Sequence, residues 1–208
     1  MEDVLDVYTR SYEEESVLVC MDETSKQQIQ EVRAPLPSAP GAPYRYDAEY
    51  QRNGVSNLFM FFAPLDGWRH VEVTAQRTKR DWALAIRQLV DEYWPKVKKI
   101  TLVMDNLNTH NPSSLYETFP PAEAKRILDR LEIHHTPKHG SWLNMAEIEL
   151  GILVRQCLSR RIPDQPTLRR ETAAWEDRRN RKKAAVDWRF TTQDARIKLK
   201  RLYPSLDV

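Results

Sequence analysis

The sequence predicts an α/β protein in which a mixed five-stranded sheet is flanked by helices. Two short apolar runs, residues 17–21 and 100–104, are each followed by an aspartate, which is typical of strands buried on both faces. Residues 57–63 and 68–75 flank a Pro-Leu-Asp-Gly turn signal and indicate an antiparallel hairpin. Between this hairpin and the second apolar run, apolar side chains recur at helical spacing.

The remaining segments complete an ordered series of elements. Residues 30–47 contain four prolines, which remove backbone donors, and we expect an irregular loop there. Thr78 and Asp81 have the spacing of a capping box and start a helix that Pro95 stops. Further helices are expected at residues 120–130, 143–159 and 166–179, with a strand at 132–136. This order is that of a ribonuclease H-like fold.

Length and composition indicate one main domain. The chain has 208 residues, of which 41% are hydrophobic, enough for one sizeable core. We expect this domain over residues 17–161, after a lead-in segment, 1–16, and before a helical extension, 162–208, packed on the same domain. The sequence has no apolar run of membrane-spanning length and no signal-peptide pattern at its start, so we expect a cytoplasmic protein.

Cysteine and histidine give no sign of a zinc site. Cys20 and Cys157 lack the paired spacing of metal ligands or a disulfide framework, and we expect both to be small buried residues. His134, His135 and His139 have no cysteine or other clear ligand partner near them. We therefore expect strand and loop roles for these histidines.

Charge is distributed unevenly along the chain. Residues 155–208 hold 15 Lys and Arg against 7 Asp and Glu, a net charge of +8, which leaves −6 for the rest because the whole chain carries +2. The densest basic run comprises Arg178, Arg179, Arg181, Lys182 and Lys183. Such a run suits contact with nucleic-acid phosphates, and a solvated helix end is an equally good interpretation.

Asp22 and Asp105 are the first candidate site residues. If the two strands before them are adjacent and parallel, their carboxylates converge at one edge of the sheet. Convergent carboxylates repel unless a cation joins them, and Mg²⁺ or Mn²⁺ prefers oxygen ligands. Two such ions, about 3.5–4 Å apart, can activate an attacking oxygen and stabilise a leaving one.

A third carboxylate is expected from the helix at residues 143–159. Glu147 and Glu149 cannot share a face, because each residue turns the helix by about 100°. Relative to an apolar stripe centred on Leu150, Glu147 lies about 60° away and Glu149 about 100° away on the other side. This spacing favours Glu147 as the residue nearer the packed face, with Glu149 as the alternative.

Three motifs resemble those of a known family. Val103-Met104-Asp105-Asn106 with Asn108-Thr109-His110, and the heptapeptide from Ser141 to Glu147, resemble the second and third acidic motifs of mariner-like transposases, especially their bacterial insertion-sequence branch. Residues 20–24, Cys-Met-Asp-Glu-Thr, resemble the first. The resemblance covers residues 17–147 and continues plausibly to Tyr203.

The resemblance implies a catalytic domain of a DNA transposase. Asp22, Asp105 and Glu147 would be the catalytic, metal-binding residues and would hold two Mg²⁺ or Mn²⁺ ions. These ions would first activate water to cleave a transposon end and then activate the freed 3′-hydroxyl to attack target DNA. The implied partners are double-stranded DNA, as transposon ends and target, and a second copy of the chain in the DNA complex. The implied location is bacterial and nucleoid-associated.

Some positions depart from the family pattern. Trp142 stands where a proline-aspartate pair is usual, and Met145 where a proline is usual. The 41 residues between Asp105 and Glu147 exceed the usual spacing. Only about sixteen residues precede the first expected strand, so we expect the catalytic part without the family's N-terminal helix-turn-helix modules.

Other polar residues near the motifs are candidates for supporting roles. Lys138, His139, Ser141 and Trp142 precede the catalytic helix, where a cation and an aromatic ring can contact phosphate and base. Trp142 is equally consistent with a core position. A second tier of candidates to position DNA or a metal-bound water comprises Glu23, Asn106, Asn108, His110 and Asn144.

Two further functions remain alternatives to a transposase. One is a non-catalytic DNA-binding or dimerising fragment, and the other is a nuclease of the same fold without strand transfer. Intact Asp22, Asp105 and Glu147 favour an active domain over the fragment. The sequence alone does not separate strand transfer from simple cleavage.

Overall fold

The computed structural model describes residues 1–11, 15–46, 48–138 and 140–203. Within them, five strands form one mixed sheet in the order β3-β2-β1-β4-β5. The strands are β1 (Ser16–Glu31), β2 (Tyr50–Ala63), β3 (Trp68–Thr74), β4 (Lys99–Met104) and β5 (Leu131–His135). β1, β2 and β3 are antiparallel neighbours, whereas β4 runs parallel to both β1 and β5. This arrangement, flanked by helices, confirms the predicted ribonuclease H-like fold.

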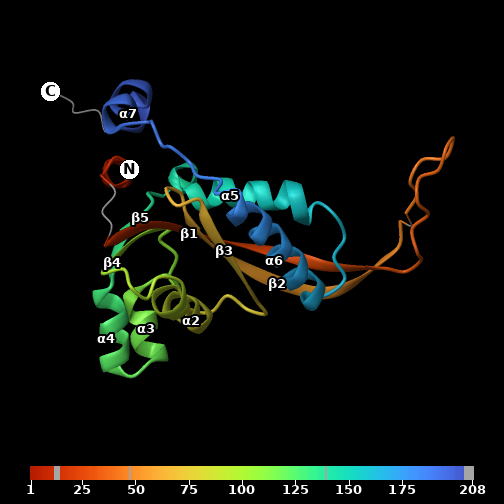
Figure 1. Cartoon of the computed structure of the whole chain (residues 1–208), viewed down its shortest axis with the longest axis horizontal. Coiled ribbons are helices and arrows are strands. Elements are labelled where there is room, and N and C mark those ends of the chain that lie inside the picture. The colour runs from red at the N-terminus through yellow and green to blue at the C-terminus, as the bar shows by residue number, and fades with distance from the viewer. Residues whose placement is uncertain (12–14, 47, 139, 204–208) are drawn as a thin grey trace.

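Helices cover both faces of the sheet (Figure 1). One face packs against α2 (Lys79–Gln88), α3 (Pro112–Thr118) and α4 (Pro121–Asp129). The other packs against α1 (Glu2–Tyr8), α5 (Met145–Leu153), α6 (Gln165–Arg181) and α7 (Thr192–Lys198). π-helical turns extend α2 and α5 over Leu89–Tyr93 and Val154–Leu158, and 3-10 turns cover Ser141–Leu143 and Lys200–Leu202. None of the helices in the described ranges is long and apolar enough to cross a membrane.

Strand β1 separates two apolar cores. Leu18 and Cys20 face the core beneath α5, and Val17, Val19 and Met21 face the core beneath α2. Successive side chains of a strand point to opposite faces, so a strand covered on both sides reads as a continuous apolar run. The interpretation of residues 17–21 as a doubly buried strand is confirmed.

The expectation that this strand stops at Asp22 is wrong, because β1 continues to Glu31. The parallel pairing with β4 ends at Cys20↔Val103, but β2 pairs with β1 from Cys20↔Phe62 to Glu31↔Tyr50. The antiparallel ladder keeps the backbone groups of β1 paired after its parallel neighbour has ended. The polar residues from Asp22 onward therefore mark a change of neighbour and not the end of a strand.

Beyond the body of the sheet, β1 and β2 form a two-stranded arm (Figure 1). Residues 32–49 close it with two isolated bridges, Leu36↔Arg45 and Ala39↔Ala42. Apart from the first two residues of 30–47, which belong to β1, the expected irregular loop is found in the described positions, and residue 47 lies outside them. Several apolar side chains of the arm are exposed, including Leu36, Tyr44 and Tyr46.

Helix starts follow local capping chemistry. The capping box of Thr78 and Asp81 is present at the start of α2, as predicted. The expected helix at 143–159 begins later, at Met145, because Asn144 is its N-cap and accepts a hydrogen bond from the backbone N–H of Ala146 at 3.1 Å. α6 confirms the last predicted helix and starts at Gln165 after the N-cap Asp164.

Side chains of α6 occupy the place of a further strand beside β3. The backbone N–H of Val71 donates to Glu176 Oε2 at 3.0 Å. Asn180 accepts from the backbone N–H of Arg69 at 2.9 Å and donates to its carbonyl oxygen at 2.8 Å. Polar groups along an edge strand otherwise invite pairing with another chain. α6 therefore closes this edge of the sheet.

The N-terminal segment forms part of the core, which its sequence did not predict. Val4, Leu5, Val7 and Tyr8 of α1 are buried. α1 contacts α7 through a bidentate pair between Arg196 and Glu2 at 2.8 Å. α1 spans only seven residues, too few for a helical period to be recognised in the sequence.

Candidate active site

Asp22 and Asp105 occupy equivalent positions on neighbouring parallel strands. The last registered pair of β1 and β4 is Cys20↔Val103, and each aspartate comes two residues later. Because side chains alternate, Asp22 continues the face of Cys20, which is covered by α5, and Asp105 comes directly after the end of β4 beside it. The predicted juxtaposition of these two acids therefore follows from the register.

Glu147 lies in the first turn of α5, whose start is attached to β1 beside Asp22. Asn144 Nδ2 donates to the carbonyl oxygen of Met21 at 2.8 Å, and Asn144 is buried. The preceding turn is held by Tyr8, whose hydroxyl donates to the carbonyl oxygen of Leu143 at 2.7 Å. One residue, Asn144, thus caps the helix and fastens it to the strand that carries the first acid.

The charges of Asp105 and Glu147 act on Asp22. Burial raises the pKa of Asp22 to about 6, and the negative charges of Asp105 and Glu147 contribute to the rise. The hydrogen bond from the backbone N–H of Glu23 to Asp22 Oδ1, 2.7 Å long, and the nearby His110 act in the opposite direction. Asp22 therefore lies within electrostatic range of both Asp105 and Glu147.

The three carboxylates are suitable ligands for a divalent metal ion, although they are not arranged around one point. Among the residues that the structure describes, no three His, Cys, Asp or Glu side chains could together hold a metal ion. Three carboxylates nevertheless offer only oxygen donors, which Mg²⁺ and Mn²⁺ prefer. A cation would also relieve the repulsion that contributes to the raised pKa of Asp22. Glu147 is exposed and has no side-chain partner among the described residues, so it is free to turn inward.

The expectation that Glu147 lies nearer the packed face than Glu149 is wrong. Glu149 is the buried one, 1% exposed, and lies 3.0 Å from Arg69 Nε. Arg179 donates to both of its carboxylate oxygens, at 2.6 and 3.0 Å. The apolar stripe does not mark the buried face of α5, because Leu143 precedes the helix and Val154, in the π-helical turn, is exposed. Glu149 is thus occupied by arginines, while Glu147 acts electrostatically on Asp22.

Arg69 is a structural residue that the sequence reasoning missed. Its side chain is fully buried and donates to the carbonyl oxygen of Ala184 at 2.7 Å as well as facing Glu149. The alternation in β3 gives a signal for it, since Arg69 shares the inward face with Val71 and Val73. A cation on the buried face of a strand requires an acidic partner.

His110 is completely buried between two carboxylates. Its Nδ1 lies 2.5 Å from Asp105 Oδ1, and its Nε2 lies 3.3 Å from Glu23 Oε2. Burial alone would lower the pKa of His110, but the hydrogen bonds with Asp105 and Glu23 outweigh it and raise the pKa to about 9. In contrast, Asn106 and Asn108 are exposed.

The predicted DNA-contacting residues have different environments. Lys138 and Ser141 are exposed, and Trp142 is 40% exposed with its ring edge-on to Phe190 at a centroid distance of 6.1 Å. His139 lies outside the described residues. Four members of the basic run are exposed at the end of α6, namely Arg178, Arg181, Lys182 and Lys183. Arg179 differs because its guanidinium is bound to Glu149.

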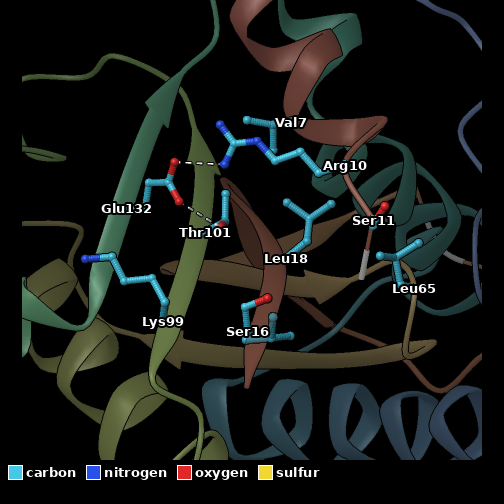
Figure 2. Close-up of a pocket in the computed structure, with 10 residues that line it drawn as sticks. Val7, Arg10, Ser11, Ser16, Leu18, Leu65, Lys99, Thr101 and Glu132 are labelled. Carbon is cyan, nitrogen blue, oxygen red and sulfur yellow. Dashed lines mark hydrogen bonds and ion pairs between the residues drawn. The ribbon is translucent and has the colours of Figure 1, made fainter. Parts of the chain in front are cut away.

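A hollow of about 430 Å³ lies elsewhere, at the opposite end of the parallel strands (Figure 2). Ser16 and Lys99, at the starts of β1 and β4, line it together with Arg10 and Glu132. Arg10 Nη1 donates to Glu132 Oε1 at 2.8 Å, and this bond lowers the pKa of Glu132 to about 2. The hollow is therefore separate from the acids that follow the other ends of these strands.

Fold and site together define a ribonuclease H-like protein with a carboxylate site beyond two parallel strands. A family model described as DDE superfamily endonuclease matches residues 17–169. The chain belongs to this family.

Similar solved structures are complexes of the Mos1 mariner transposase. The Mos1 paired-end complex with Mn matches with a TM-score of 0.58 at 15% identity, over 88% of this chain and 55% of the Mos1 chain. The Mos1 strand transfer complex matches with a TM-score of 0.55 at 14% identity, over 88% and 56% of the two chains. The chain thus spans little more than half the length of Mos1, and the likeness is one of fold. No curated protein sequence matches the chain.

Proposed function

We propose that this chain is the catalytic domain of a transposase, which cleaves DNA at transposon ends and joins the freed 3′ ends to target DNA. Asp22, Asp105 and Glu147 are its catalytic residues. The observation that carries the proposal is the electrostatic coupling of Asp22 to Asp105 and Glu147, from two adjacent parallel strands and the helix over them. The sequence motifs favour the bacterial insertion-sequence branch of the mariner-like enzymes.

The three acids are proposed to bind two Mg²⁺ or Mn²⁺ ions. Bound ions would supply the Lewis acidity that phosphodiester cleavage and strand transfer require. Asp22 and Asp105 provide ligands from the sheet, and Glu147 provides one from α5. Asn144 keeps the start of α5 against β1, and the exposed side chain of Glu147 would turn inward to complete the site. Relatives of similar fold include Mos1 complexes with Mn and with Mg, which supports this choice of metals.

Double-stranded DNA is the proposed partner, both as transposon end and as target. The exposed cations Arg178, Arg181, Lys182 and Lys183 suit phosphate contacts, and Lys138, Ser141 and Trp142 lie just before the catalytic helix. Arg179 is held by Glu149, so we assign it a smaller share of DNA binding. Similar folds occur in the Mos1 paired-end complex with the left transposon end and in the Mos1 strand transfer complex, which supports action on DNA ends. A second copy of this chain in the DNA complex is part of the same proposal.

The proposed division of the chain assigns catalysis to residues 17–161. Residues 162–208 are a basic extension that packs on this domain through α6, and residues 1–16 are a lead-in that contributes α1 to the core. A DNA-processing role places the protein in the bacterial cytoplasm, in association with the nucleoid.

The test is a strand-joining reaction with the complete chain. A labelled pre-cut DNA end, a plasmid target and Mn²⁺ are incubated with wild type, Asp105→Ala or Asp187→Asn, the last being a control at an exposed carboxylate. We expect metal-dependent joining by the wild type and the control, and at least a 100-fold loss in Asp105→Ala. Cleavage without joining would identify a nuclease, and DNA binding without either reaction would identify a non-catalytic fragment.

A further inference from the structure

We infer that His110 is the positioning residue for Asp105. It holds one carboxylate oxygen by a hydrogen bond and leaves the other free for a metal ion. This inference rests on the proposed function, because it concerns how one of the three acids is oriented. His110 would not itself touch metal or DNA, since its side chain has no exposed surface.

The loop after β4 brings His110 back beside Asp105. The backbone N–H of His110 donates to the carbonyl oxygen of Leu107 at 2.9 Å, which closes a turn five residues beyond the aspartate. On the other side, Ser114 Oγ donates to the carbonyl oxygen of Thr109 at 3.0 Å, and Asn111 caps α3. The backbone at His110 is thus fixed by bonds on both sides.

The ring of His110 has a single orientation that uses both of its nitrogens. Nδ1 is hydrogen-bonded to Asp105 and Nε2 to Glu23. Trp82 of α2 stacks on the imidazole, with a centroid distance of 6.0 Å and an interplanar angle of 28°. Two directed hydrogen bonds and one stacked ring thus favour a single orientation of the imidazole.

Glu23 connects this arrangement to the first acid. Its side chain accepts from His110 and, through Oε1, from Arg77 Nη1 at 3.0 Å, while its backbone N–H donates to Asp22 Oδ1. Asp22 and Glu23 are consecutive in β1 and point to opposite faces of the sheet. Glu23 therefore links the orientations of both aspartates, directly for Asp22 and through His110 for Asp105.

The second carboxylate oxygen of Asp105 indicates that His110 orients a metal ligand and does not merely complete the hydrogen bonding of a buried carboxylate. Asp105 Oδ1 is held by His110, whereas Oδ2 accepts no hydrogen bond from any residue that the structure describes. The side chain of Asp105 is 33% exposed, so a metal ion can approach it from solvent. Hydrogen bonds to a ligand carboxylate orient it, and loss of such a partner commonly weakens metal binding about 10–100-fold.

Three substitutions of His110 test the roles of its two ring nitrogens separately. The amide nitrogen of His110→Asn replaces Nδ1 and can still donate to Asp105, whereas that of His110→Gln replaces Nε2 and reaches Glu23. His110→Phe keeps an aromatic ring against Trp82 and removes both donors. Calorimetric titration of the complete chain with Mn²⁺ gives the affinity, with Asp105→Ala as the reference without the site, and thermal unfolding in EDTA reports folding.

We expect His110→Asn to bind Mn²⁺ within about threefold of wild type, and His110→Gln and His110→Phe to bind about 10–100-fold more weakly. The Mn²⁺ concentration for half-maximal strand joining should rise by the same factors. Wild-type affinity in folded His110→Phe would overturn the inference. If that variant does not fold, equal affinities of the Asn and Gln variants would overturn it instead.

The same titrations separate this inference from the proposed function. If Asp105→Ala abolishes Mn²⁺ binding while the His110 variants keep the wild-type affinity for Mn²⁺, the metal site is supported and the positioning role is refuted. If wild type and Asp105→Ala bind Mn²⁺ equally, the proposed site itself falls, and the positioning role falls with it.

Discussion

At the scale of single residues, the site places negative charges where the fold disfavours them. Asp22 is largely buried, and Asp105 and Glu147 are near enough to repel its charge. Its pKa of about 6 lies above the ordinary value of 3.8. The stabilising contribution of this group is complete below the ordinary pKa and is lost as the pH rises through about 6. At neutral pH the metal-free site is therefore a source of instability.

Replacing Asp22 by Asn should stabilise the metal-free protein at pH 7. The amide oxygen can still accept from the backbone N–H of Glu23, while the repelled charge is gone. We expect a gain in the free energy of unfolding of about 1–3 kcal/mol at pH 7, shrinking toward zero near pH 4. Urea unfolding in EDTA at both pH values measures it, and Asp187→Asn is the control. An equal effect at both pH values would contradict the electrostatic explanation.

The sequence predicted those features of the candidate site that depend only on residues near one another in the chain. Asp22 and Asp105 follow apolar runs, and the parallel register of β1 and β4 then places both at the same end of these strands. The helical period failed to choose between Glu147 and Glu149, because their difference depends on Arg69 and Arg179 from other elements. The orientation of His110 likewise depends on Glu23, which lies 87 residues earlier.

At the scale of elements, α5 is attached to its neighbours at two points, at its N-cap Asn144 and at Glu149 in its second turn. Asn144 binds β1, and Glu149 binds Arg69 of β3 and Arg179 of α6. Glu149 thereby fixes the rotation of α5 about its axis, which determines that Glu147 faces outward. A buried carboxylate held by two guanidinium groups is costly to disrupt, because its removal leaves buried cations unpaired.

Glu149→Gln and Glu147→Gln form a matched pair of substitutions two residues apart on one helix. Glu149→Gln should lower the free energy of unfolding by about 3–5 kcal/mol, because the buried arginines lose their countercharge. Glu147→Gln should leave stability within about 0.5 kcal/mol, since the side chain is exposed, and should abolish strand joining. Denaturant unfolding and the joining reaction measure the two effects. Similar stability of both variants would refute the assigned role of Glu149.

Elements with a complete local signature were predicted, and those that depend on partners were not. Thr78 and Asp81 identify the start of α2 from four consecutive residues. The continuation of β1 past Asp22 depends instead on β2, which lies across an 18-residue connection, residues 32–49. α7, Thr192–Lys198, was missed because its packing partner is α1 at the other end of the chain.

At the scale of the whole molecule, the arm of β1 and β2 extends beyond the body that folds around the sheet (Figure 1). Its closing residues 32–49 contribute nothing buried among the described positions, whereas the body contains both apolar cores. The stability of the body should therefore be nearly independent of residues 32–49.

Replacing residues 32–49 by an Asn-Gly turn tests this independence. Glu31 and Tyr50 are a registered pair, so a two-residue hairpin turn can join them. We expect the free energy of unfolding to stay within about 1 kcal/mol of wild type, because none of the described side chains that are removed is buried. Urea unfolding measures it, with Mn²⁺ affinity as a check on the site. A loss of several kcal/mol would show that the closing loop supports the body.

The pairing of β3 with side chains of α6 also bears on synthesis. While a ribosome is still making the chain, all five strands can assemble before Glu176 and Asn180 have been translated. During that interval the outer hydrogen-bonding groups of β3 have no cover, and two nascent chains can join through them. A product ending before Glu176 would keep this liability permanently, so premature termination between the end of β5 and Glu176 should yield aggregates.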